Sequence, residues 1–89
     1  MIEREVEIVN RLGLHARAAA KLVQTATAFR CKVVLHKDGE AVDAKSILGI
    51  LLLAAGLGSR MTIRCEGADE APALDAVVQL VADRFGEDC

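Results

Sequence analysis

The chain has 89 residues, of which 53% are hydrophobic and 27% are charged, and its formal net charge is −2. This length predicts a single domain spanning residues 1–89, and the composition excludes an intrinsically disordered chain. The slightly acidic balance argues against a basic face that binds the phosphate backbone of nucleic acids.

The first third of the sequence predicts a strand, a loop and a helix. Residues 2–8 alternate between apolar and acidic side chains, with Arg4 the one poor fit on the apolar face, and this pattern is typical of a half-buried strand. Residues 9–14 then form a loop. From Ala16 the apolar spacing changes to that of a helix. The residues on its apolar face are Ala18, Ala19, Leu22, Val23, Ala26 and Phe29.

The rest of the chain predicts a hairpin, a short helix, a strand and a last helix. Strands over 31–37 and 40–44 flank Asp38-Gly39, a dipeptide typical of tight hairpin turns. Ser46 is suited to cap an apolar helix that runs to about residue 55. Another strand spans 60–66, and Asp69 is placed to cap a last helix whose apolar face includes Leu74, Val77, Val78, Val81 and Phe85.

The order β-α-β-β-α-β-α predicts an α/β (α+β) fold, an open-faced sandwich with the helices on one side of an antiparallel sheet. We expect the last strand to lie between the first two, which gives the order 1-4-2-3. Periodicity alone does not fix that order.

The segment Gly13-Leu14-His15-Ala16-Arg17 places a histidine where a loop becomes a helix. The first N–H groups of a helix have no internal partner and attract anions. Neutral imidazole is a nucleophile, and Arg17 offers a forked set of donors for phosphoryl oxygens. The segment therefore has the parts needed for a transferable phosphohistidine. On spacing alone, a polar cap or a surface histidine is the commoner interpretation.

Three segments in order resemble the bacterial phosphotransferase system's histidine-containing phosphocarrier family, HPr. They are Gly13-Leu14-His15-Ala16-Arg17, Lys45-Ser46-Ile47 with Gly49, and Gly67-Ala68-Asp69-Glu70. The resemblance covers about residues 5–85. It implies the sheet order 1-4-2-3, four strands with three helices on one face, and a carrier that is not an enzyme. It also implies phosphorylation of His15 on Nδ1.

The resemblance further implies partners and regulation. Enzyme I, charged by phosphoenolpyruvate, would supply the phosphoryl group, enzyme IIA domains would receive it, and no cofactor or metal is needed. An HPr kinase/phosphorylase would modify Ser46. Ala16 and an exposed apolar patch of Ile47, Leu48 and Leu51 would contact partners. We expect a monomer.

One position departs from the family pattern, since Ala18 stands where proline is usual. Proline would fix the backbone of the first helical turn, whereas alanine is simply a good helix former. An alternative is therefore a regulatory relative, for nitrogen or carbon control, with little role in sugar uptake.

Other functions fit the sequence less well. RNA-binding modules of similar architecture stack bases on strand aromatics, which these strands lack. A metal chaperone would require a pair of cysteines in the first loop, which contains none. A small enzyme would require a second acid or base near His15, and none is evident in the sequence. We predict buried Cys31 and Cys65, an exposed Cys89 and a surface position for His36.

Two observations bear on where the protein is found. The first ten residues are charged and alternating, unlike a signal peptide. The longest apolar run, residues 47–57, is too short to span a bilayer. We expect a cytoplasmic protein without membrane insertion.

Overall fold

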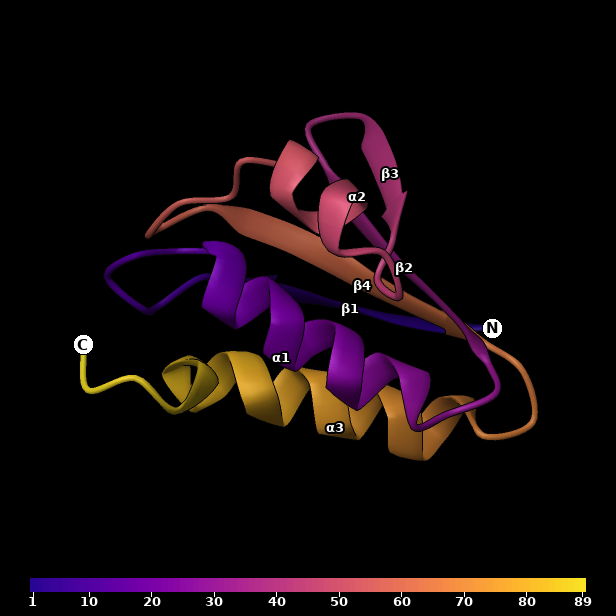
Figure 1. Ribbon diagram of the computed structural model, residues 1–89. Coiled ribbons are helices and arrows are strands. Elements are labelled where there is room, and N and C mark those ends of the chain that lie inside the picture. The colour runs from indigo at the N-terminus through magenta and orange to yellow at the C-terminus, as the bar shows by residue number, and fades with distance from the viewer.

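The computed structural model describes residues 1–89 and contains one four-stranded sheet. Its strands are β1 (Ile2–Glu7), β2 (Lys32–Lys37), β3 (Glu40–Asp43) and β4 (Arg60–Glu66). Their order is β1-β4-β2-β3, and every neighbouring pair is antiparallel. The predicted fold class and strand order are confirmed (Figure 1).

Alternation along β4 decides which face of the sheet is covered. Met61, Ile63 and Cys65 are buried toward the helices, whereas Arg60 and Arg64, which alternate with them, face outward. On that open face Arg64 Nε donates to Glu3 Oε2 at 2.9 Å. Exposed ion pairs of this kind contribute little to stability. The sheet is therefore held mainly by its apolar face.

Helices α1 (Ala16–Thr27) and α3 (Glu70–Ala82) lie side by side against that apolar face (Figure 1). The predicted apolar stripe of α1 is largely confirmed. Ala18, Ala19, Leu22 and Ala26 are buried, and Val23 is half-buried against the same core. In this core, which has a single buried aromatic ring, small aliphatic side chains let the two helices approach the sheet closely.

The hairpin between β2 and β3 also follows the prediction. Asp38 and Gly39 have φ values of 52° and 83°, and the strands pair directly outside them. Two successive positive φ values are the geometry of a type I′ turn, which matches the twist of the strands.

No helix of the chain has both the length and the apolar character needed to cross a membrane.

Helix α2 (Ile47–Leu52) is shorter than predicted. It ends three residues before the expected position, because Leu53 turns into the core and Ala54 adopts a φ of 51°. A left-handed residue cannot continue a right-handed helix. Gly56 and Gly58 lie beyond this end of the helix.

Two predictions for the last helix are wrong in detail. Asp69 stands at the N-cap position of α3, but its carboxylate does not cap the helix. It accepts instead from the backbone N–H groups of Arg30 at 2.8 Å and Cys31 at 2.9 Å. At the other end, α3 stops at Ala82, and Phe85 lies in a separate turn, η1 (Arg84–Gly86).

Candidate functional site

His15 is the N-cap residue of α1 and has extended backbone angles, φ −74° and ψ 178°. Its carbonyl accepts from the Ala19 N–H at 2.8 Å, but its side chain makes no cap hydrogen bond. The N–H groups of Ala16, Arg17 and Ala18 donate to nothing in the protein. This end of α1 therefore carries unsatisfied donors and the positive end of the helix dipole.

The loop before His15 is fixed by close backbone packing. Leu14 N–H donates to the Ala55 carbonyl at 2.9 Å. Gly13 has a φ of +66°, and a side chain there would place Cβ 2.5 Å from the same carbonyl oxygen. Only glycine combines that φ with so close an approach. The segment after α2 thereby sets the position of the histidine.

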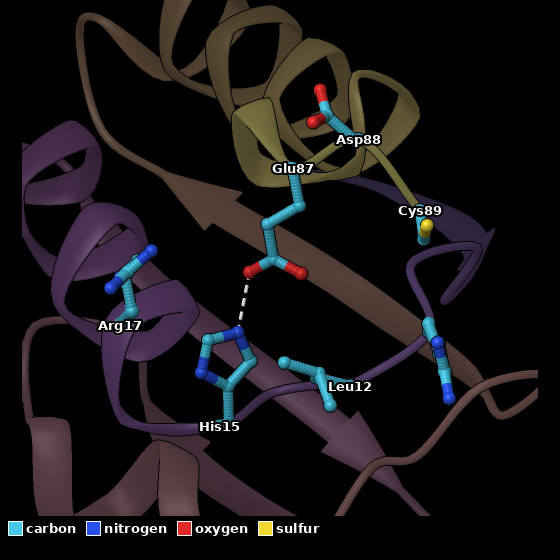
Figure 2. A pocket seen from close by; sticks show the side chains of 7 residues that line it. Leu12, His15, Arg17, Glu87, Asp88 and Cys89 are labelled. Carbon is cyan, nitrogen blue, oxygen red and sulfur yellow. Dashed lines mark hydrogen bonds and ion pairs between the residues drawn. The ribbon is translucent and has the colours of Figure 1, made fainter.

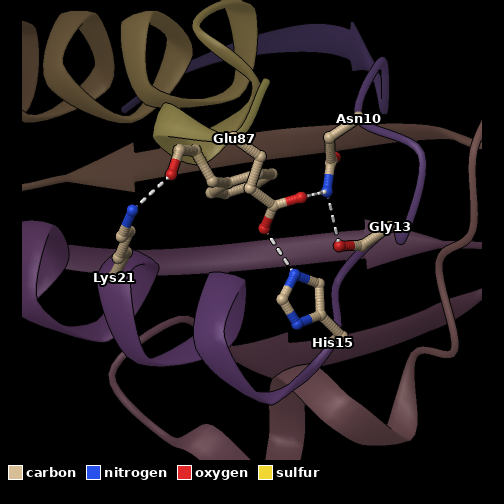
Figure 3. A network of polar contacts seen from close by, with 6 residues as sticks. Asn10, Gly13, His15, Lys21 and Glu87 are labelled. Carbon is tan, nitrogen blue, oxygen red and sulfur yellow. Dashed lines mark hydrogen bonds and ion pairs between the residues drawn. The ribbon is translucent and has the colours of Figure 1, made fainter. Parts of the chain in front are cut away.

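The His15 ring contacts a carboxylate from the far end of the sequence. Its Nε2 bonds to Glu87 Oε2, and the other Glu87 oxygen accepts from Asn10 Nδ2 at 3.0 Å (Figure 3). The same Asn10 nitrogen donates to the Gly13 carbonyl at 2.8 Å. Burial acts to raise the pKa of Glu87, but the hydrogen bonds from His15 and Asn10 outweigh it and lower the pKa below its ordinary value.

A turn of three successive residues with positive φ values brings Glu87 to the His15 ring. Arg84, Phe85 and Gly86 have φ values of 57°, 54° and 77°. Phe85 is completely buried, and its carbonyl accepts from Lys21 Nζ at 2.6 Å. The backbone carbonyl of Cys89 accepts from the Arg11 N–H at 2.9 Å. Residues 83–89 are thus folded back against the loop that carries His15.

An open cavity of about 540 Å³ lies over the histidine (Figure 2). His15 and Arg17 both line it, as the sequence predicts, and the Arg17 side chain makes no hydrogen bond or ion pair in the protein. The remaining lining residues are Arg11, Leu12, Glu87, Asp88 and Cys89. Arg17 is exposed and free to contact an anion bound at His15.

Ser46 caps α2 as predicted, with its Oγ accepting from the Gly49 N–H at 3.1 Å. The three residues predicted as an apolar patch are exposed: 45% for Ile47, 69% for Leu48 and 38% for Leu51. Leu52, at 67%, belongs to the same exposed surface and was not predicted. Ala16, the remaining predicted partner contact, is exposed in the first turn of α1.

No spacing in the sequence points to Asn10 or Glu87 as residues of this site. Glu87 lies 72 residues from His15, and Asn10 is a buried polar side chain in a segment read as a plain loop. Their roles follow from the fold of residues 83–89, which depends on a buried phenylalanine and a left-handed turn. A short local motif cannot encode such a contact.

The other candidate residues lie apart from this site. Cys31 and Cys65 are buried and Cys89 is exposed, as predicted. Burial raises the pKa of the Cys65 thiol to about 11, which disfavours a reactive thiolate at neutral pH. His36 is half-buried on the open face of the sheet, so the prediction of a surface position is only partly correct. No group of three or more histidine, cysteine, aspartate or glutamate side chains is arranged to hold a metal ion.

Comparison with known proteins places this site in a family. Residues 2–83 match the family described as "PTS HPr component phosphorylation site". The chain is 52% identical over 87 residues to the phosphocarrier protein HPr of Cupriavidus necator, with 98% of each chain covered. It is 48% identical over 88 residues to the phosphocarrier protein HPr of Xylella fastidiosa, with 99% of each chain covered.

Solved structures agree with the sequence relatives. A crystal structure of HPr-C-His from Thermoanaerobacter tengcongensis matches with a TM-score of 0.97 at 44% identity, over the whole of both chains. A crystal structure of an HPr dimer from the same organism has a TM-score of 0.79 at 45% identity and covers 98% of this chain and all of that one. Since that relative is described as a dimer, a monomer stays a prediction here. The family match, the relatives and the shared fold together show that the chain belongs to the HPr family of phosphocarrier proteins of the phosphotransferase system.

Proposed function

We propose that His15 accepts a phosphoryl group from phosphorylated enzyme I and passes it to enzyme IIA domains in the cytoplasm. The observation that carries this proposal is the place of His15 at the start of α1, where three backbone N–H groups have no partner. These donors and the helix dipole favour a dianion at the ring. His15 is 28% exposed, so a protein partner can reach it.

The transfer uses the ring as a nucleophile. The lone pair of Nδ1 forms a bond to phosphorus while the bond between phosphorus and the donor atom breaks, and that electron pair returns to the donor. Onward transfer is the same step in reverse toward an acceptor. Arg17, in the first turn of α1, lines the cavity and can bind the phosphoryl oxygens through its guanidinium group. The phosphoryl group comes from phosphoenolpyruvate through enzyme I, and no cofactor is required.

The apolar patch of Ile47, Leu48 and Leu51 is the proposed docking surface. Exposed apolar side chains gathered on one short helix are typical of partner contacts. The segment after α2 accepts the Leu14 hydrogen bond, so this helix is joined directly to the His15 loop. A partner bound on α2 would therefore lie beside the histidine.

Ser46 is the proposed regulatory site, modified by an HPr kinase/phosphorylase. It is half-buried at the start of α2 and immediately precedes the patch. A phosphate at this position would add about −1.5 to −2 charges at neutral pH. Such a charge next to an apolar docking surface would have to lose its water when a partner binds, which would oppose docking.

The direct test is phosphorylation by enzyme I and phosphoenolpyruvate, followed by the mass of the intact protein. We expect the wild type to gain one phosphoryl group that is labile in acid and stable in base. His15→Ala should gain none, whereas His36→Gln, which changes the only other histidine, should be labelled like the wild type. Unchanged labelling of His15→Ala would remove the proposal.

A further inference from the structure

The Glu87 carboxylate contacts the His15 ring but is not one of the groups that would bind the phosphoryl group in the proposed transfer. We propose that Glu87 is a positioning residue for that transfer: it holds the Nε2–H of His15 and leaves Nδ1 as the nucleophilic nitrogen. The inference rests on the proposed function and adds a residue to its site. Three observations support it: the hydrogen-bond pattern, the charge, and the way residues 83–89 are held.

The hydrogen-bond pattern fixes where the proton on the ring is. Glu87 accepts from Asn10 through one oxygen and contacts His15 Nε2 through the other (Figure 3). The pKa of Glu87 is below its ordinary value of 4.5, so the group is a carboxylate at neutral pH. A carboxylate can only accept hydrogen bonds. His15 Nε2 must therefore be the donor, and in the neutral ring Nδ1 carries the free lone pair.

The orientation of the ring follows from the same contact. With Nε2 held by Glu87, Nδ1 is the ring nitrogen without a hydrogen-bond partner in the protein. Figure 2 shows Glu87 above the ring and Arg17 on the side of α1. If the ring turned over, Nε2–H would point away from the Glu87 carboxylate. That carboxylate, whose side chain is 14% exposed, would then lose one of its two hydrogen-bond donors.

The carboxylate also suits the charge that develops on the ring. When Nδ1 bonds to phosphorus, the ring gains positive charge while its proton stays on Nε2. A neighbouring carboxylate stabilises that charge through a charge-assisted hydrogen bond. When the phosphoryl group leaves, the electron pair of the P–N bond returns to Nδ1 and the ring is again neutral. No proton needs to leave or enter in either direction.

The position of Glu87 is strongly determined by its surroundings. Arg84 and Phe85 adopt left-handed backbone angles, which are unfavourable for a residue with a side chain. Such conformations persist where neighbouring contacts enforce them, and they gather at functional sites. Here the contacts are the buried Phe85 ring, the Lys21 bond to its carbonyl and the Arg11 bond to Cys89. They hold the carboxylate at the histidine.

The test compares Glu87→Gln with Glu87→Ala and uses Glu40→Gln as a matched control. Glu40 is an exposed residue of β3 whose side chain makes no hydrogen bond or ion pair. The first measurement is the tautomer of His15 in the unphosphorylated protein, read from its ring ¹⁵N chemical shifts. We expect the Nε2–H form in the wild type, in Glu40→Gln and in Glu87→Gln, since an amide oxygen can still accept. Glu87→Ala should give a mixture of tautomers.

The second measurement is the rate of enzyme I-dependent phosphorylation. Glu87→Gln should be slower by about tenfold, because a charge-assisted hydrogen bond is roughly twice as strong as a neutral one. Glu87→Ala should be slower still, and Glu40→Gln should match the wild type. If Glu87 only held residues 83–89 in place, Glu87→Gln and the wild type would be phosphorylated at equal rates, provided that their melting temperatures are the same.

The outcomes separate the two proposals. Wild-type rates in both Glu87 variants would overturn the positioning role, as would an Nδ1–H tautomer in the wild type. Failure of the proposed function would look different, because the wild type itself would then gain no phosphoryl group on His15. The tautomer measurement needs no phosphoryl transfer, so it reports on the Glu87 contact in either case.

Discussion

Helices α1 and α2 begin at N-cap residues that treat their helix ends differently. Ser46 turns its hydroxyl back onto α2 and accepts from the Gly49 N–H. His15 turns its ring away from α1 toward Glu87, so the first N–H groups of α1 remain free. A self-capped end needs only its own residues, whereas an open end needs a distant group to hold the capping side chain away from the helix.

This difference predicts where the molecule is sensitive to change. The α2 end should respond to local substitutions at Ser46 alone. The α1 end should respond to residues far away in the sequence, namely those that hold the loop at Gly13 and those that hold residues 83–89. Substitutions at the α1 end should therefore have the largest effects.

Phe85→Ala should have the largest effect. Removing a completely buried phenylalanine typically costs about 3–5 kcal/mol in the free energy of unfolding. Because the ring anchors residues 83–89, we also expect loss of the Glu87 contact and slower phosphorylation of His15. Chemical denaturation measures the first effect. Phe29→Ala, which removes the only other aromatic ring from a half-buried position, should cost less and leave His15 unaffected. An equal loss in both variants would argue against a special role for Phe85.

Gly13→Ala should come next. The new Cβ would lie 2.5 Å from the Ala55 carbonyl oxygen and 2.8 Å from Gly56 Cα, at a φ that disfavours any side chain. We expect a loss of about 2 kcal/mol, the scale of backbone strain with a forced shift of neighbouring backbone. Gly56→Ala is the control, since a Cβ there meets nothing within 4 Å. If melting curves of the two variants coincide, the close approach does not position the loop.

Much of the fold could be predicted from the sequence because it is governed by local patterns. The strand predicted over 60–66 is β4, and the Asp38-Gly39 pair predicted the hairpin turn. His15 and Arg17 are neighbours in the sequence and therefore also in the site. The sequence-based predictions were wrong or incomplete where a side chain bonds to a residue far away in the sequence. Asp69 bonds to the residues before β2 instead of capping α3, and Glu87 reaches His15 through a left-handed turn.

Ser46 tests the self-capped end. Ser46→Ala should cost about 1 kcal/mol in stability, because it leaves the Gly49 N–H without its acceptor. Ser46→Asp should keep the cap and therefore the stability, since aspartate is as good an N-cap as serine. It should nevertheless slow phosphorylation of His15 by adding negative charge next to Ile47 and Leu48. Equal transfer rates in Ser46→Asp and the wild type would leave Ser46 as a cap only.

Acid should weaken the open end through Glu87. Its pKa is lowered in the folded protein, so its contribution to stability is present above the ordinary value of 4.5 and is lost as the pH falls through the lower folded value. The basic side chains that face it are those of His15 and Lys21. In Glu87→Gln the free energy of unfolding should therefore fall less steeply as the pH is lowered below the ordinary value of 4.5. Identical slopes for the two proteins would contradict the lowered pKa.

Leu48→Glu should have the smallest effect on stability and a clear effect on binding. Leu48 is 69% exposed, and substitutions at such positions usually change stability by less than about 0.5 kcal/mol. The same change places a carboxylate within the proposed docking surface, where burying an unpaired charge opposes association. We expect weaker binding to enzyme I at an unchanged melting temperature. Ile50→Glu offers the contrast, since Ile50 is completely buried on the same short helix and its substitution should unfold the protein. Unfolding by Leu48→Glu would show that the residue is part of the core. Wild-type affinity in a stable Leu48→Glu variant would show that partners bind elsewhere, and α2 would then carry a regulatory serine without a docking surface beside it.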